Sequence, residues 1–97
     1  MRLRVAPGAE EELAEAAAWY EARRPGLGIE LVAVIDRELE EIAAAPSLHA
    51  LWRTDRPYRH RAVRRFPYVI FFRAEVGEVF IVAIAHARRR PGYWAGR

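Results

Sequence analysis

The residues that could transfer protons or bind anions lie mostly in the second half of the chain. The three histidines are His49, His60 and His86, and an imidazole gains or loses a proton near neutral pH. Two arginine clusters stand near them in the sequence: Arg59, Arg61, Arg64 and Arg65, then Arg88, Arg89 and Arg90. Clustered arginine attracts anions, and each guanidinium can bind a phosphate or carboxylate through two hydrogen bonds. These residues therefore indicate acid–base chemistry or anion binding, and the histidines are not spaced as a metal site.

Charge is divided unevenly between the two halves of the chain. Residues 1–48 contain five arginines and ten acidic residues, a net charge of −5, whereas residues 49–97 contain eleven arginines and three acidic residues, a net charge of +8. The acidic runs Glu10–Glu15 and Glu38–Glu41 are spaced as solvated helix surface, and we assign them no chemistry. All 16 basic residues are arginine, which a GC-rich genome explains as well as selection for phosphate binding does. We expect a basic surface in the second half, with a solvated sheet face that has no partner as the alternative.

Length and composition limit the kind of protein. A chain of 97 residues is large enough for one hydrophobic core, which predicts a single domain over residues 1–97. Cysteine is absent, which excludes disulfides and thiolate metal sites, and no phosphate-binding loop follows a strand. The apolar runs are too short for a membrane span or a signal peptide. The sequence predicts a soluble, cytoplasmic protein without membrane contact, metal or cofactor.

The spacing of apolar residues predicts two helices and four strands. Apolar side chains recur at helical spacing in two segments separated by a glycine-rich and proline-containing breaker, which predicts a helical hairpin. The final apolar run has no polar face, so that strand should lie in the centre of the sheet. The expected elements are strand 2–6, one helix from Pro7, a second from Leu27 to Pro46, and strands 58–65, 68–72 and 79–85. The predicted fold is α+β, in the order β-α-α-β-β-β.

Four aromatic residues lie where they could belong either to the core or to an interface. Trp19 and Tyr20 are expected in the core, because Tyr20 continues the apolar stripe of the first helix. Tyr93 and Trp94 lie in a short final segment that cannot build a core of its own. These two aromatics either face a partner or fold back onto residues such as Phe66, and both alternatives are open.

Several local patterns, together with the element order, resemble the RelE/ParE superfamily of toxins from type II toxin–antitoxin systems. The resemblance extends over nearly the whole chain and is most specific in the final segment, which is similar to the tail of ParE-like plasmid-stabilisation proteins. It implies a helical hairpin packed on a small, mainly antiparallel sheet. The matching residues are Val5, Pro7, Ala9 and Leu13; Trp19, Tyr20 and Glu21; Gly26, Leu27 and Gly28; Ile35, Asp36, Leu39, Ile42 and Pro46; Phe66, Pro67 and Tyr68; and Ala85, His86, Arg89, Pro91, Tyr93 and Trp94.

The resemblance implies a protein that arrests growth unless a cognate, ParD-like antitoxin binds it, and therefore a hetero-oligomer with that antitoxin. ParE-like members block DNA gyrase by binding, whereas RelE-like members are ribosome-dependent messenger-RNA endonucleases. We interpret the chain as a ParE-like gyrase inhibitor that catalyses no reaction itself. The predicted partner-binding residues are both arginine clusters (Arg59, Arg61, Arg64, Arg65, Arg88, Arg89 and Arg90) with Tyr93 and Trp94.

An endoribonuclease is the alternative interpretation. Cleavage of RNA through its 2′-hydroxyl group needs a proton acceptor, a proton donor and positive charge to stabilise the phosphate. Arginine can supply only the positive charge, and RelE-like enzymes fill the other two roles with lysine, histidine, glutamate or tyrosine; this chain contains no lysine. The alternative catalytic set is His86, Tyr93, Arg61 and Arg88, with the ribosome and messenger RNA as partners. A third possibility is a relative that binds its antitoxin but is not toxic.

Overall fold

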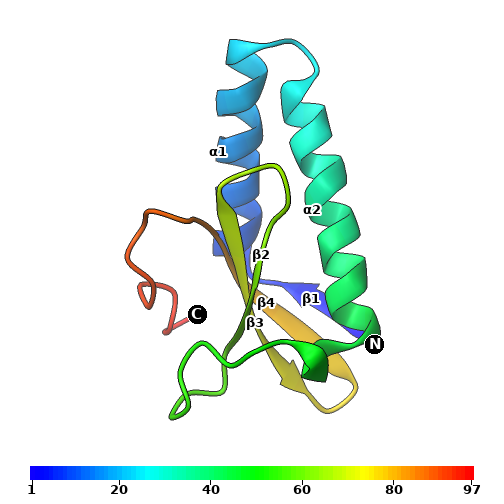
Figure 1. The fold of residues 1–97 in the computed structure, drawn as a ribbon, viewed down its shortest axis with the longest axis vertical. Helices are drawn as coiled ribbons and strands as arrows, with labels where there is room; N and C mark the ends of the chain where they lie inside the picture. The colour runs from blue at the N-terminus through cyan, green and yellow to red at the C-terminus, as the bar shows by residue number, and fades with distance from the viewer.

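Two long helices form a hairpin that packs against a four-stranded mixed sheet in the computed structural model, which describes all of residues 1–97 (Figure 1). The observed element order, β-α-α-β-β-β, confirms the predicted α+β fold. The elements are β1 (Arg2–Val5), α1 (Pro7–Arg23), α2 (Leu27–Ala44), the short 3₁₀ turn η1 (Pro46–Leu48), β2 (Arg59–Ala62), β3 (Tyr68–Glu75) and β4 (Glu78–His86).

The sheet has the strand order β1-β4-β3-β2, so the last strand in the chain lies in its interior. β4 runs parallel to β1 and antiparallel to β3, and β3 is antiparallel to β2. Every residue from Val79 to Ala85 is buried, as expected for an apolar strand covered on both faces. β2 is shorter than the predicted strand 58–65, because residues 63–67 form a loop in which Arg65 has a φ of 72°.

The predicted apolar stripes account for the packing of the hairpin. Buried residues of α2 recur at helical spacing, and those of α1 are small, which brings the two helices close together. A Cβ atom on Gly28 would lie 2.3 Å from the carbonyl oxygen of Ala17, so this crossing requires glycine. The carboxylate of Glu21 closes the turn by accepting hydrogen bonds from the backbone N–H groups of Gly26 and Gly28, at 2.7 and 2.9 Å. The bond from Gly26 is the largest cause of the lowered pKa of Glu21.

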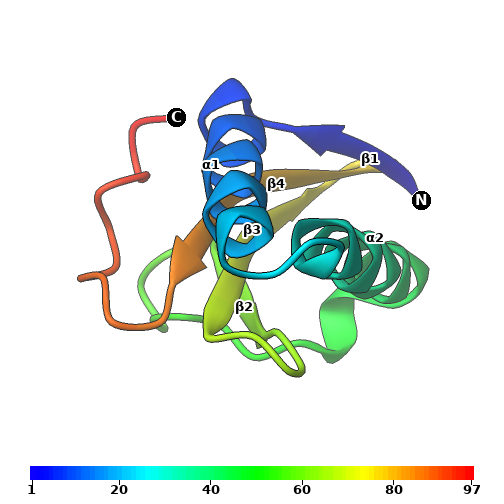
Figure 2. The ribbon, with the colours of Figure 1, turned by 90° about the horizontal axis from the view of Figure 1, so that it is seen from above.

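The final segment, residues 87–97, is called the tail here and folds back across the side of the sheet away from α2 (Figure 2). Trp94 is fully buried and packs against Phe71, Tyr58 and Trp52, with ring centroids 4.6, 4.8 and 5.0 Å away. The Tyr58 hydroxyl donates a hydrogen bond to the carbonyl of Ala95 at 3.0 Å. Of the two alternatives for Trp94, the structure therefore shows the core location, although against other aromatics than Phe66.

The expected core location of the first-helix aromatics is half right. Tyr20 is partly buried and packs edge-on against Phe66, with ring centroids 5.1 Å apart. Trp19 is 52% exposed, so its predicted place in the core is wrong. It lies one residue off the apolar stripe, and the Arg23 guanidinium covers its outer face at 3.5 Å from the ring centroid. Neither helix is long and apolar enough to cross a membrane.

Candidate partner-binding site

Arg61 of β2 does not face solvent but points toward α2, where two carboxylates hold it. Its guanidinium forms ion pairs with Glu38 and Glu41, and donates from Nη1 to Nε2 of His49 at 3.0 Å. Glu38 is only 3% exposed, so its predicted solvated position is wrong. The apolar residues Ile35 and Ile42 stand three positions before and four positions after Glu38, which places its carboxylate on the buried face of α2.

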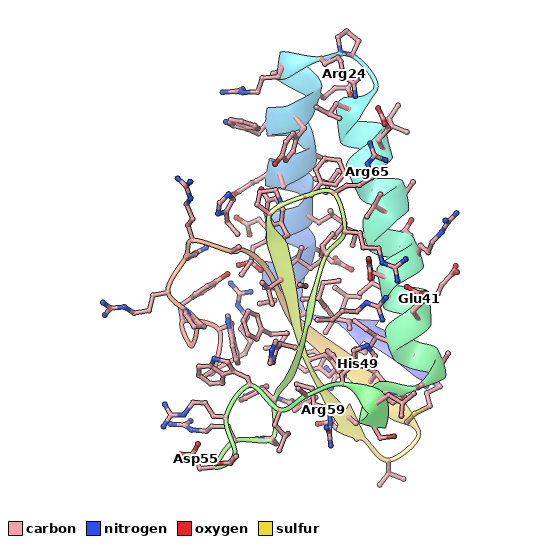
Figure 3. All side chains as sticks on the ribbon, in the orientation of Figure 1. Arg24, Glu41, His49, Asp55, Arg59 and Arg65 are labelled. Atoms are coloured by element: carbon pink, nitrogen blue, oxygen red, sulfur yellow. The ribbon has the colours of Figure 1, made fainter.

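The other arginines of this first cluster also make contacts within the chain. Arg59 donates to the backbone carbonyl of His49, and Arg65 forms an ion pair with Glu30 at 2.9 Å that is the main cause of the lowered pKa of Glu30. Figure 3 shows Arg65, Glu41 and His49 spaced along α2, with Arg59 at the far end of this row. Arg59 and Arg64 have no acidic partner, and the guanidinium of Arg64 alone makes no hydrogen bond within the chain. The cluster therefore ties β2 and its loop to the α2 side instead of forming one free basic face.

The second arginine cluster lies in the exposed turn that follows β4. The backbone N–H of Arg88 donates to Nδ1 of His86 at 3.1 Å, and neither Arg88 nor Arg90 has an acidic partner. Arg89 stacks on the ring of Tyr93 with 3.6 Å between guanidinium carbon and centroid. Because Ala87 bonds to Pro67, this turn lies at the same end of the sheet as the loop that carries Arg64 and Arg65, as the antiparallel pairing predicts.

One carboxylate, that of Glu12 on α1, joins the tail to β4. It accepts the backbone N–H of Ile84 at 3.0 Å and the Tyr93 hydroxyl, and it pairs with Arg97 at 3.1 Å. Its side chain is 12% exposed, so the predicted solvated position of Glu12 is also wrong. The helical spacing contained the signal, because Glu12 is three residues after Ala9 and four before Ala16, both of which are buried.

A pocket of about 330 Å³ opens between α1 and the end of β4, beside Glu12, and is called the α1–β4 pocket here. Four aromatic rings, apolar side chains and four polar side chains line it. The aromatic rings are Trp19, Tyr20, Tyr68 and Tyr93; Ala16, Ile84 and Ala85 supply apolar surface; and Glu12, Glu15, His86 and Arg89 supply polar groups. Such a combination suits an apolar or aromatic side chain of a partner.

Two tyrosines of this pocket have raised pKa values. Burial is the main cause for both, and for Tyr93 the hydrogen bond to the Glu12 carboxylate adds to it, so its pKa rises to about 12. Tyr93 is therefore protonated at neutral pH and acts as a hydrogen-bond donor. The tyrosine keeps an exposed fraction of 36%, which leaves part of its ring available at the surface.

The residues of the endoribonuclease alternative are only partly brought together. His86 and Tyr93 line the same pocket and Arg88 follows directly, but Arg61 is held in its ion pairs with α2. The remaining histidines make structural contacts. His49 packs edge-on against Phe72, and His60 lies against Phe71 with a buried, unbonded Nδ1. No group of three or more histidine, cysteine, aspartate or glutamate side chains could hold a metal ion.

The fold and this site define a class of protein: a small α+β chain in which a helical hairpin covers a mixed sheet and an aromatic, basic tail folds against both. The family model described as the ParE toxin of the type II toxin–antitoxin system parDE matches residues 3–91. A solved structure described as the chromosomal ParDE system from P. aeruginosa has a TM-score of 0.79 and 20% identity, and covers 91% of this chain and 97% of that chain. No curated protein matches the sequence. The chain belongs to the ParE toxin family, which confirms the resemblance.

Proposed function

We propose that the protein is the toxin of a type II toxin–antitoxin pair, that it inhibits DNA gyrase by binding, and that a cognate antitoxin neutralises it. The observation that carries this proposal is the anchored tail. Trp94 fixes the tail in the core, and the tail then presents Arg88, Arg90 and part of the Tyr93 ring at the surface. Arginine and tyrosine on a rigid support are the residue types that contribute most to protein interfaces.

Two features support binding over catalysis. Arg61 pairs with Glu38 and Glu41, so its charge is already compensated within the chain. Tyr93, with a pKa of about 12, would be a poor proton acceptor near neutral pH. The opposing observation is that His86 and Tyr93 line one pocket, which keeps messenger-RNA cleavage as the second candidate function.

The deciding experiment combines induction in cells with a purified gyrase assay. If the proposal is right, induction triggers the DNA-damage response, purified protein inhibits supercoiling, and co-expression of the antitoxin abolishes both effects. The double variant Arg88→Ala/Arg90→Ala should inhibit supercoiling at least about ten-fold less well, because an interface arginine that acts as a hot spot contributes about 2 kcal/mol or more and ten-fold corresponds to about 1.4 kcal/mol. Arg37→Ala, which removes an exposed arginine of α2, is the matched control and should inhibit normally.

The same cells separate the second candidate. Primer extension on cellular messenger RNA would reveal codon-positioned cuts if the protein is a ribosome-dependent nuclease, and His86→Ala would then abolish them. Rapid translation arrest with such cuts, and undisturbed supercoiling, would refute the gyrase proposal. A complete lack of growth defect would instead indicate a family member that binds an antitoxin without being toxic.

A further inference from the structure

The second half of β4 lacks a neighbouring strand on one side. β1 pairs with β4 only from Glu78 to Ile81, and the last backbone bond between them runs from the N–H of Ala6 to the carbonyl of Ile81. The chain then leaves the sheet, because α1 begins at Pro7. From Val82 to His86, β4 is bonded to β3 alone, and no strand pairs with its other edge, which is called the open edge here.

The pairing pattern tells which main-chain groups point to this open edge. In an antiparallel pair, residues alternate between those that bond across to the partner strand and those that point away from it. Ala87 donates to Pro67 at 2.8 Å and thus bonds across to the β3 side. The alternation then directs the N–H and C=O groups of His86 and Ile84 away from β3, in agreement with the bond from Ile84 to Glu12.

Side chains occupy two positions of this edge in place of a strand. Glu12 accepts the N–H of Ile84 at 3.0 Å, and Arg97 donates to the carbonyl of Val82 at 3.1 Å. The next two groups along the edge are the carbonyl of Ile84 and the N–H of His86, and neither has a side-chain partner. A C=O group at one residue and an N–H group two residues later can both bond to a single residue of an extended second chain, which donates its N–H to the first and accepts from the second through its C=O.

The open edge and the α1–β4 pocket adjoin each other, because Ile84, Ala85 and His86 belong to both. A strand added to an edge directs alternate side chains to the two faces of the sheet. One of these side chains would enter the pocket, where Ala16 and Ile84 provide apolar contact and the aromatic rings surround it. The free main-chain groups and the pocket thus fit the same ligand, an extended peptide with a large apolar side chain.

We propose that an extended segment of the antitoxin pairs with β4 at Ile84–His86 and inserts one large apolar side chain into the α1–β4 pocket. This inference rests on the toxin–antitoxin function proposed above. The segment continues the line of β1 along the edge of β4, and it displaces the side chains of Tyr93 and Arg97 from Glu12. Trp94 stays buried, so the tail shifts locally and does not unfold.

A matched pair of variants tests the main-chain contact. His86→Pro removes both the imidazole and the outward N–H, whereas His86→Ala removes only the imidazole. Proline is tolerated where a strand N–H faces away from its neighbour. We expect His86→Pro to bind the antitoxin encoded by the adjacent gene at least ten-fold more weakly than His86→Ala does, with both variants showing native circular dichroism. Equal affinities of the two variants would overturn the proposal.

Hydrogen exchange provides a second test that needs no substitution and therefore applies even if the proline variant does not fold. In the complex, the His86 amide should exchange at least about a hundred-fold more slowly than in the free protein, whereas the amides of Leu3 and Val5 on the outer edge of β1 should not change.

Protection of the β1 edge or of the hairpin alone, with His86 unaffected, would place the antitoxin elsewhere and overturn the docking proposal while leaving the toxin–antitoxin function intact. Protection of His86 through self-association, with dimers in sedimentation, would identify a second copy as the occupant and also overturn it. If the adjacent product neither binds nor relieves growth arrest, the proposed function fails and this inference fails with it.

Discussion

Replacement of Glu38 by alanine should strongly destabilise the protein, although the sequence places this residue in an acidic run. The change leaves the guanidinium of Arg61, which is only 18% exposed, without its buried carboxylate. Two partners remain for Arg61: the ring of His49 and the carboxylate of Glu41, which is 44% exposed. The Arg64 backbone N–H loses its acceptor as well.

The expected loss follows from the burial of the pair. Breaking a buried ion pair from one side costs about 3–5 kcal/mol, and the remaining contact with Glu41 places this case near the lower end, at about 3 kcal/mol. For a protein of this size that loss lowers the melting temperature by about 12–24 °C. Glu38→Ala/Arg61→Ala removes both charges, so its cost should be smaller than the sum of the two single changes by at least about 1 kcal/mol.

Urea unfolding monitored by tryptophan fluorescence measures these losses, because Trp94 is buried and Trp52 packs against it. Asp36→Ala removes an exposed carboxylate from the same helix and is the matched control, with an expected change of about 0.5 kcal/mol or less. A loss of the same small size in Glu38→Ala, or strict additivity of the two single changes, would refute the structural role given to this pair. Arg61 would then again be available for a partner.

Three further predictions concern packing and pH. Gly28→Ala should destabilise the hairpin by about 1–3 kcal/mol, because the new methyl group meets a backbone carbonyl of α1, whereas Gly96→Ala, with open space around it, should change the unfolding midpoint little. Tyr93 has a folded-state pKa of about 12 against an ordinary value near 10, so the stability that it contributes is complete below about pH 10 and is lost as the pH rises toward 12. In alkaline unfolding, the Tyr93→Phe variant should not show this loss of stability. The pKa of Glu30 is lowered mainly by Arg65, so the stability that Glu30 contributes is present above its ordinary pKa and is lost as the pH falls. An NMR titration of the Arg65→Ala variant should show a higher pKa of Glu30, and an unchanged pKa would contradict the ion pair.

The fold was predictable because α2 and β4, which form much of its core, each carry a local pattern of apolar residues. The stripe that includes Leu31, Ile35 and Ile42 determines which face of α2 is buried, independently of the rest of the chain. The apolar run that became β4 could only be accommodated in the interior of the sheet. Such signals are local, so they can be found without knowing what lies on the other side of the core.

The site was less predictable because its contacts join segments far apart in the sequence. Glu12 and Glu38 fall within acidic runs, and charge alone placed them in solvent, although helical spacing put each beside the buried stripe. Their partners lie 23 to 85 residues away along the chain. The burial of Trp94 depends on Trp52 and Tyr58, which come from a segment without periodicity. Clustering of arginine was therefore a poor guide to exposure, because these distant carboxylates decide which guanidinium groups remain available.

The position of Glu12 links the two surfaces that the proposals assign to different partners. Its carboxylate bonds both to Ile84 on the open edge of β4 and to Tyr93 and Arg97 of the tail. A segment paired with that edge takes the space into which the two tail side chains reach, so it changes the surface that Tyr93 presents to a target. Under the two proposals together, the antitoxin need not cover the whole tail in order to neutralise the toxin. It needs only to compete for one carboxylate, while the buried indole of Trp94 holds the rest of the tail in the core.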